Sequence, residues 1–352
     1  MDVRILDRDL KVINILDTYE SFIWTDRYDE CGDFELFIGM NSSLIDILQE
    51  NYYLQILKSD RTMIIEDIII KSDSESGNKL KVTGRSLESI LNRRIIWGLK
   101  VLRGNLHDGI KSIITENIIS PSISSRKIDN FIFEDSNDPY IKKLTIDTQY
   151  TGDNIYDIIS EICKNNGIGF SITINENQQF VFKLFRGTDR SYDQVENPYI
   201  IFSPKFDNMI NSNFAYSIKE YKNVALIAGE GEAYERKYFV TGDYSGMDRR
   251  EVFVDARDVT STNDDNVQLS TDEYNKLLAQ KGIDELNEHK ISSTFEGEID
   301  SAFNYKYGED FFNGDIVQFA DEYGKESKVR IFETVISESE DGLSIYPTFN
   351  NI

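Results

Sequence analysis

The sequence predicts a mixed, β-rich α+β fold with two barrel-like β domains and an inserted α+β domain. The chain has 352 residues, whereas an ordinary domain has roughly 100–200, so several domains are expected. Short apolar runs broken by turns dominate both ends of the chain, and helical periodicity follows residue 86. Aromatic residues at 12% with only five prolines also favour half-buried strands. The predicted domains span residues 1–85, 86–205 and 206–352.

The first domain is predicted from short apolar segments that Asp, Arg and Gly turns separate. Ser42–Gln49 is a short helical candidate among them, and an acidic turn at 72–78 precedes the last strand. Strands at this spacing are typical of a small sandwich or barrel. The predicted strands are Val3–Leu6, Val12–Ile15, Ser21–Trp24, Phe34–Ile38, Tyr53–Leu57, Met63–Ile70 and Leu80–Val82.

The second domain begins where the apolar spacing changes to that of a helix. Ser86 is the expected N-cap of its first helix, and Glu88 suits the positive end of the helix dipole. Gly167 is the expected left-handed cap at the end of the third helix. The helices are predicted to start near Leu87, Leu106 and Ile155, and a hairpin is predicted from Gly169–Thr173 and Phe180–Leu184.

The third domain is predicted as a second β-barrel-like domain that carries a helix at about 271–289. Ser270 and Glu273 form a capping box at the start of this helix, and its apolar stripe drifts after Gly282. Gly229-Glu230-Gly231 imitates a dinucleotide-binding turn, but it lacks the third glycine and its acidic side chains would face the pyrophosphate, so a hairpin is favoured. The predicted strands are Ala215–Ile218, Asn223–Ala228, Lys237–Val240, Glu251–Val254, Ser293–Glu298, Asp315–Phe319, Lys328–Ile336 and Leu343–Tyr346.

The two ends of the chain resemble each other, which suggests that one barrel-like module occurs twice. Tyr53–Ile56 matches Ile316–Phe319 as apolar-apolar-Gln-apolar, and Ile64–Ile69 parallels Ile331–Ile336. Each pair continues through an acidic, glycine-containing turn into a short apolar strand. The alternative is that both segments are ordinary antiparallel hairpins that look alike.

The chain is strongly acidic, with 38 basic and 62 acidic side chains and a net charge of −24. A field of this sign repels phosphate backbones and anionic lipid headgroups before contact. We therefore expect no stable nucleic-acid binding and no membrane binding. The N-terminus lacks the features of a signal peptide, which favours synthesis in the cytoplasm.

The sequence predicts no cofactor, no metal and no catalytic residue. Cys31 and Cys163 are isolated, so neither a zinc ribbon nor a redox dithiol is expected. His107 and His289 are also isolated and are expected on helix surfaces. Carboxylates are too abundant for a chance pair to indicate a glycosidase. Calcium at Asp264-Asp265 or along Ser72–Ser76 is less favoured than solvated acidic turns.

Several motifs in consistent order resemble the hub proteins at the tail tip of long-tailed bacteriophages and prophages, a family related to the central hub beneath contractile-tail spikes. The motifs extend from about residue 20 to residue 320 and include Trp24–Tyr28, Gly32–Leu36, Gly84–Leu87, Arg249–Arg257 and Gly314–Val317. The family residues are interpreted as structural or interface positions: Trp24, Arg27, Tyr28, Gly32, Asp33, Phe34, Gly84, Arg85, Ser86, Arg250, Asp255, Gly314 and Asp315.

The resemblance implies a structural, non-enzymatic baseplate hub in the virion tail, assembled in the host cytoplasm. It implies a homotrimer with pseudo-sixfold symmetry that joins the tail tube to the tail end and forms part of the DNA channel. The implied partners are the distal tail protein ring, the tape-measure protein and a receptor-binding or spike protein. The chain stops at Ile352, without the lytic or host-binding extension of many relatives.

Two alternatives belong to other functional classes. One is a tail-associated cell-wall hydrolase that uses carboxylates, and the other is a carbohydrate-binding adhesion module that uses some of the 19 tyrosines. The missing nucleophile motifs count against the hydrolase. Tyrosine is also common in ordinary strand packing, so the tyrosines do not separate the adhesion module from the hub.

Overall fold

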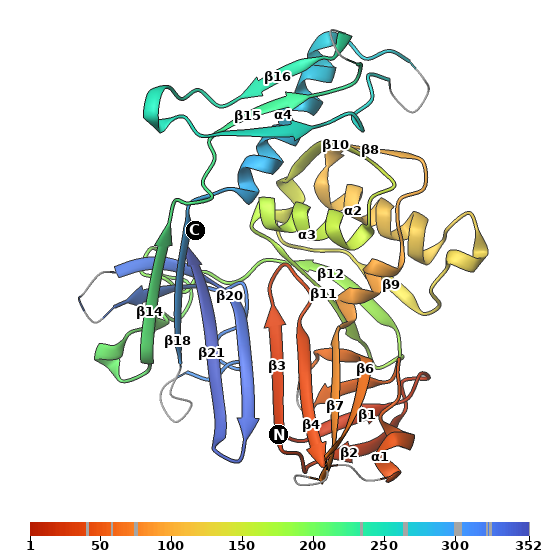
Figure 1. Cartoon of the computed structure of the whole chain (residues 1–352), viewed down its shortest axis with the longest axis vertical. Coiled ribbons are helices and arrows are strands. Elements are labelled where there is room, and N and C mark those ends of the chain that lie inside the picture. The colour runs from red at the N-terminus through yellow and green to blue at the C-terminus, as the bar shows by residue number, and fades with distance from the viewer. Residues whose placement is uncertain are drawn as a thin grey trace.

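The computed structural model describes residues 1–39, 42–57, 59–73, 77–232, 235–262, 267–298, 305–321, 323 and 326–351. Figure 1 shows the β strands of the two chain ends side by side, with helical and mixed segments packed above them. The acidic segments 264–265 and 74–76, considered above as cation sites, lie outside the described residues.

The mixed, β-rich fold is confirmed, and its largest element is one sheet that runs through both chain ends. This sheet has 13 strands, in the order β14-β18-β21-β20-β3-β4-β7-β6-β5-β1-β2, with β19 attached to β20 and β13 attached to β19. Three smaller sheets have two or three strands each. The pairings among the described strands close neither chain end into a barrel, so we call the two halves the N-terminal and C-terminal β modules.

The N-terminal β module contains the strands predicted for the first domain. Burial alternates along β4 because successive side chains point to opposite faces of a strand. Trp24 and Phe34 are buried in its core together with Leu36 and Val82. Its elements are β1 (Val3–Leu6), β2 (Val12–Leu16), β3 (Ser21–Arg27), β4 (Asp33–Gly39), α1 (Ser42–Ile47), β5 (Tyr53–Ile56), β6 (Thr62–Asp73) and β7 (Gly77–Ser86).

The α+β domain follows, and it begins with a 3₁₀ helix, η1 (Leu87–Arg93), in which the expected N-cap is wrong. The Ser86 side chain makes no capping bond; its Oγ accepts a hydrogen bond from Gly32 N at 2.8 Å. Asn105 caps α2 and Asn154 caps α3. Gly167 ends α3 with φ 62°, which is the predicted left-handed cap. The elements are β8 (Leu99–Asn105), α2 (Leu106–Ile114), β9 (Phe131–Glu134), β10 (Thr145–Thr151), α3 (Ile155–Asn166), β11 (Gly169–Ile174) and β12 (Phe180–Phe185).

The C-terminal β module is interrupted by a separate unit that the sequence assigned to the second barrel. Residues 224–288 form their own three-stranded sheet, β16-β15-β17, with the helix α4 packed on it around a core of their own. The capping box at Ser270 is confirmed. The helix continues past Gly282 to Glu288. The glycine lets it pack closely on Ile227, where a Cβ would come within 2.6 Å. The elements are β15 (Val224–Ala228), β16 (Tyr238–Thr241), β17 (Glu251–Asp255) and α4 (Thr271–Glu288).

The C-terminal β module itself has a core of tilted and edge-to-face aromatic rings, among them Phe295, Phe319 and Phe349. Its strands are β13 (Ile201–Phe202), β14 (Ile210–Ser217), β18 (Ser292–Glu298), β19 (Ile316–Ala320), β20 (Glu326–Ser339) and β21 (Gly342–Asn351).

Five strands occur twice, in the same chain order and with the same antiparallel neighbours. The path β3-β4-β7-β6-β5 of the N-terminal module corresponds to β14-β18-β21-β20-β19 of the C-terminal module. The long middle strand has a bulge in each copy, at Glu66 in β6 and at Phe332 in β20. Aligning the bulges makes Phe34 equivalent to Phe295, and Trp24 equivalent to Phe214.

The repeat therefore agrees with the similarity in the sequence, with corrections to its register. The match of Tyr53–Ile56 to Ile316–Phe319 has the register of the structure. The match of the β6 segment to β20 is one residue out, because aligning the bulges makes Glu66 equivalent to Phe332 and not to Glu333.

Candidate functional site at the junction of the two modules

The two β modules are joined by direct strand pairing. Strand β3 runs antiparallel to β20 over seven residue pairs, from Arg27 opposite Glu333 to Ser21 opposite Ser339. Ile336, opposite Trp24, packs against the core of the N-terminal module although it belongs to the C-terminal one. The junction is therefore part of one continuous sheet with shared apolar packing.

Arg27 fixes this junction electrostatically. Its guanidinium donates to Glu333 Oε2 of β20 and to Asp33 Oδ2 of β4, each at 2.6 Å, and to the Cys31 carbonyl at 2.9 Å. Burial alone would lower the pKa of Arg27, but the two carboxylates raise it. The charge is held between three segments, so Arg27 positions both β3 and the turn that follows it.

Tyr28 lies where the two modules and the α+β domain meet. Its ring is fully buried, its hydroxyl donates to the Gly167 carbonyl at 3.1 Å, and the Arg330 guanidinium stacks over it at 5.2 Å. Gly314, at φ 97°, leaves room for this ring, because a Cβ there would come within 2.2 Å of it. Burial raises the pKa of Tyr28 to about 12, so the hydroxyl remains a neutral donor.

Three further family positions form the tight turn between β3 and β4 and its support on β7. Gly32 lies against the Thr25 carbonyl, where a Cβ would come within 2.1 Å. Gly84 of β7 packs against the Ile64 carbonyl of β6 and against the Phe34 ring. Ser86 binds Gly32 through both its backbone and its side chain. These residues shape the backbone, and none of them lines the cavity described below.

Two charged family positions hold neighbouring strands and loops. Asp315 is buried and accepts hydrogen bonds from Thr188 N at 2.7 Å and Arg190 Nε at 2.9 Å, which ties the C-terminal module to the chain after β12. Arg85 pairs in bidentate fashion with Glu66 at the bulge of β6.

Arg250 and Asp255 are not part of the junction. Both lie in the separate unit formed by β15–β17 and α4. Arg250 donates to the Ile218 carbonyl at 2.7 Å, and Asp255 pairs with Arg257 and Arg236. The structure therefore brings eleven of the thirteen family positions to the junction and its adjoining turns, and leaves two apart.

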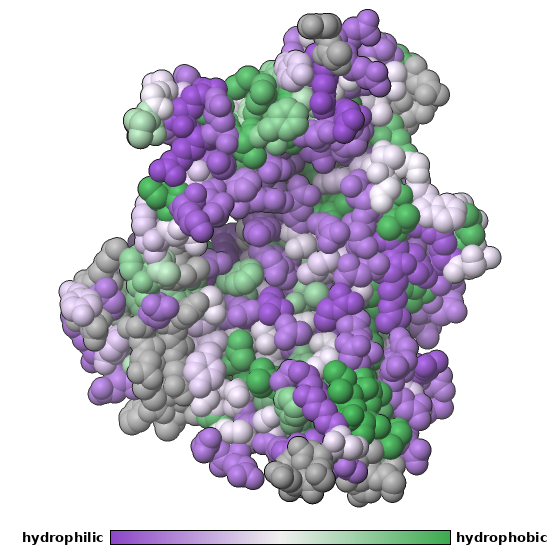
Figure 2. Space-filling model, in the orientation of Figure 1, coloured by the Kyte–Doolittle hydropathy of each residue, from purple (hydrophilic) through white to green (hydrophobic). Residues whose placement is uncertain are grey.

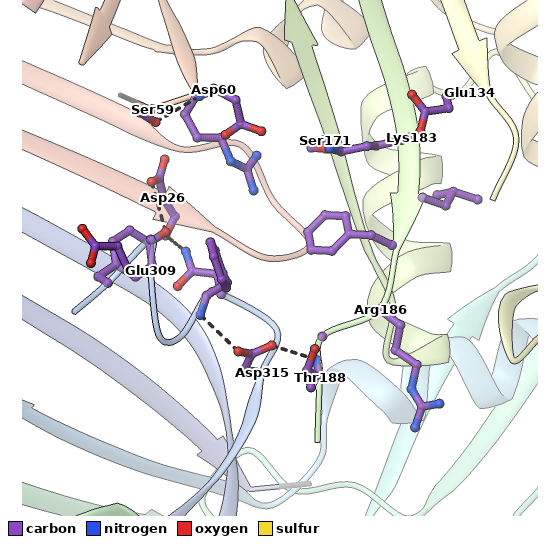
Figure 3. Close-up of a pocket in the computed structure, with 18 of the residues that line it drawn as sticks. Asp26, Ser59, Asp60, Glu134, Ser171, Lys183, Arg186, Thr188, Glu309 and Asp315 are labelled. Atoms are coloured by element: carbon purple, nitrogen blue, oxygen red, sulfur yellow. Dashed lines mark hydrogen bonds between the residues drawn. The ribbon is translucent and has the colours of Figure 1, made fainter. Parts of the chain in front are cut away.

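A cavity of about 940 Å³ opens beside the junction, between the N-terminal module, the α+β domain and the C-terminal module. Figure 3 shows Asp26 and Asp60 on one wall, Ser171 and Lys183 opposite them, and Asp315 bound to Thr188 below. Six carboxylates and three cations are among the described lining residues, which include neither His nor Cys. A nucleophile–imidazole or thiol–imidazole pair is therefore absent from the described walls of this cavity.

A buried polar network in the wall of the cavity was not predicted from the sequence. Asp26 accepts from Trp24 Nε1 at 3.0 Å and from the Tyr307 hydroxyl at 3.1 Å, and burial raises the pKa values of Asp26 and Tyr307. Glu88, 1% exposed, accepts from Arg61 at 3.0 Å and from Ile172 N at 2.8 Å. Burial would lower the Arg61 pKa, but the charge of Glu88 raises it.

The expectation that both histidines lie on helix surfaces is wrong for His107. This residue is buried at the start of α2, and its Nε2 accepts from Ser136 N at 3.1 Å. In the ranges that the structure describes, no three His, Cys, Asp or Glu side chains form a group that could hold a metal ion. No helix among the described residues is long and apolar enough to cross a membrane.

We expect the stability of the chain to fall as pH rises because of Asp29, in the turn after Tyr28. Asp29 is 7% exposed, its Oδ1 has no hydrogen-bond partner among the described residues, and burial raises its pKa to about 7. An unfolded Asp has a pKa of about 3.9, so the folded state holds an extra proton between about pH 4 and 7. The free energy of unfolding then decreases over this window, by roughly 3–4 kcal/mol in total.

The measurement is urea unfolding of the wild type and of Asp29→Asn at pH 4.5, 6 and 8. The variant should be the more stable protein at pH 8, by roughly 2–4 kcal/mol, and nearly equal to the wild type at pH 4.5. Glu176→Gln, at an exposed position, should reproduce the wild-type profile. Parallel profiles for wild type and Asp29→Asn would contradict the role of Asp29.

Comparison with known proteins gives the family. The family model described as "Siphovirus ReqiPepy6 Gp37-like protein" matches residues 2–349. No curated protein matches the chain. The solved structures with this fold include three tail proteins that are each at most 14% identical, so they show the fold alone.

These structures match the chain almost from end to end. The tail protein from Neisseria meningitidis MC58 has a TM-score of 0.57 at 14% identity and covers 99% of this chain and 96% of that chain. The 43 kDa tail protein of prophage MuSo2 from Shewanella oneidensis has a TM-score of 0.59 at 12% identity, with 99% and 98% covered. The prophage tail protein gp18 from Listeria monocytogenes EGD-e has a TM-score of 0.52 at 13% identity, with 100% and 95% covered.

Proposed function

Because the chain belongs to the Siphovirus ReqiPepy6 Gp37-like family of phage tail proteins, we propose that it is the structural hub at the tip of the tail. In this role three copies form a ring that joins the tail tube to the tail end and surrounds the path of the DNA. The observation that carries the proposal is the five-stranded unit that occurs twice in one chain.

The repeat gives three chains a ring of six comparable modules. Within each chain, the N-terminal and C-terminal modules already contact each other edge to edge through β3 and β20. A closed ring of three chains needs one further, heterologous contact, from the C-terminal module of one chain to the N-terminal module of the next. Six equivalent modules on one circle would suit a sixfold ring of distal tail protein above them.

The partners of this hub are the distal tail protein ring, the tape-measure protein and a receptor-binding or spike protein. A net charge of −24 per chain, or 3 × −24 = −72 per ring, supports a channel through which DNA slides without binding. The same charge requires the contacts between chains to be locally apolar or charge-paired. The family residues at the junction act in this proposal as positioning residues for the ring and not as a catalytic site.

The native mass tests the ring. One chain has a mass of 40.7 kDa, so a trimer should appear at about 122 kDa by native mass spectrometry or light scattering over a range of concentrations. A monomer–trimer equilibrium agrees with the proposal. A stable twofold dimer, or a tail-tip structure in which the two modules do not alternate around one axis, contradicts it.

A further inference from the structure

The two copies of the five-stranded unit differ in how their long middle strand is paired. In β20, residues 326–330 pair with β19, and residues 333–339, beyond the bulge, pair with β3 along the same edge. In β6, residues 62–64 pair with β5 in the equivalent way. Beyond its bulge, residues 67–73 of β6 pair with β7 on one side and with no strand that the structure describes on the other.

The strand equivalent to β3 is β14, and it lies at the opposite end of the same sheet. It pairs with β18 as β3 pairs with β4, and the strand order of the sheet ends there. Six strands separate β14 from β6. Figure 1 shows β14 on the far side of the C-terminal module from β3, and β6 on the far side of the N-terminal module from β20. One chain therefore cannot pair the two strands itself.

We propose that β14 of one chain pairs antiparallel with residues 67–73 of β6 of the next chain, and so repeats between chains the β3–β20 pairing within a chain. This inference rests on the proposed ring of three chains. The register follows when each residue of the β3–β20 pairing is replaced by its equivalent in the other copy, with the two bulges aligned. The expected pairs are then Ile68 opposite Tyr216, Ile69 opposite Ala215 and Ile70 opposite Phe214.

The side chains at these positions suit burial between two copies. Ile69 and Ile70 are 44% and 50% exposed, and Tyr216 is 60% exposed. Figure 2 shows apolar side chains gathered on the N-terminal module in the region of β6 and the neighbouring strands. A sheet edge with exposed apolar residues promotes unwanted pairing unless a partner covers it. A neighbouring chain is the partner for which the fold already contains a template.

The proposed pairing between chains also repeats the side-chain contacts of the β3–β20 pairing within a chain. Within the chain, Ile336 lies opposite Trp24 and covers the core of the N-terminal module. The equivalent pair between chains is Ile70 opposite Phe214, whose ring stacks on Phe295 at 4.4 Å. Isoleucine against an aromatic ring is thus the same cross-strand contact in both junctions, and such pairs stabilise antiparallel strands.

Disulfide cross-linking tests the strand pair and its register. Ile69→Cys with Ala215→Cys places two thiols directly opposite each other in neighbouring chains. Ile69→Cys with Tyr216→Cys is the matched control, because a shift of one residue puts the second thiol on the other face of the sheet. The native Cys31 is half-buried and Cys163 is buried, so the wild type oxidised in parallel gives the background.

At concentrations where native mass shows the trimer, oxidation of the in-register variant should give covalent dimer and trimer on a denaturing gel, at least tenfold more than the control. A trimer that forms in solution without this cross-link, or with equal cross-linking in the control, overturns the strand pairing and leaves the hub in place. A chain that stays monomeric at every concentration overturns the ring and the pairing together. A cross-linked ladder that continues beyond three chains overturns the closed ring alone.

Discussion

Replacing Gly84 with alanine should unfold the N-terminal β module. An added Cβ would lie 1.8 Å from the Ile64 carbonyl oxygen of the neighbouring strand and 2.9 Å from the Phe34 ring. The first contact is with backbone, so no side-chain rotation can relieve it. Strand β6 would have to move away from β7, which breaks their ladder next to the bulge. We expect a loss of at least about 4 kcal/mol in the free energy of unfolding.

Gly39→Ala is the matched control in the same sheet. A Cβ on Gly39, at the end of β4, meets no heavy atom within 4 Å. Its effect should be within about 1 kcal/mol of zero, since alanine lowers the entropy of the unfolded chain. Urea denaturation of the three proteins, followed by circular dichroism, gives the comparison. Equal stabilities for Gly84→Ala and the wild type would show that the close approach of β6 and β7 is not required.

Glu88→Gln should cost roughly 3–5 kcal/mol, because it leaves the half-buried Arg61 without its nearest carboxylate. Glutamine has the shape of glutamate and can still accept the Ile172 hydrogen bond, so the change isolates the charge. The Glu88 side chain is 2% exposed. Removal of its charge takes away the largest electrostatic compensation for burying the Arg61 guanidinium, since Asp26 and Asp60 act on it more weakly.

A double-mutant cycle with Arg61→Gln separates this pair from general disruption. The double variant should be less destabilised than the sum of the two single variants, by at least about 1 kcal/mol. Glu134→Gln, at an exposed carboxylate on the rim of the same cavity, should change stability by less than about 0.5 kcal/mol. If the losses in free energy of unfolding from Glu88→Gln and Arg61→Gln add up in the double variant, the two residues are not coupled.

The secondary structure could largely be predicted because its signals are local. Alternating burial in β4, the capping box at Ser270 and the left-handed Gly167 each depend on residues a few positions apart. Ser86 shows where such signals fail: its spacing is that of an N-cap, yet its hydroxyl binds Gly32, 54 residues earlier. The Ser86 hydroxyl forms a long-range hydrogen bond in place of the local capping bond.

The polar network and the division of the C-terminal half could not be predicted for the same reason. Glu88 finds Arg61 at a sequence distance of 27 and Ile172 at a distance of 84, so no motif marks the group. The strands β15–β17 are short segments between turns, as are the strands of the C-terminal β module, so their sequences do not show which sheet each one joins. The long-range pairing of β14 with β18 shows the division. It joins the segments before and after β15–β17 in one sheet, so that unit becomes an insertion between two neighbouring strands.

The repeated five-stranded unit also bears on how such a chain can evolve. In a ring of six identical subunits every substitution appears six times, whereas two copies in one polypeptide diverge independently. The position of Gly84 in the first copy is that of Phe349 in the second, which is fully buried among aromatic rings. Close backbone contact fills the core at one position and a large side chain fills it at the other. The two copies also carry different insertions: the α+β domain follows β7, and the β15–β17 unit separates β14 from β18. In the proposed ring, two copies in one chain let alternate modules acquire different attachments while the five-stranded framework is kept.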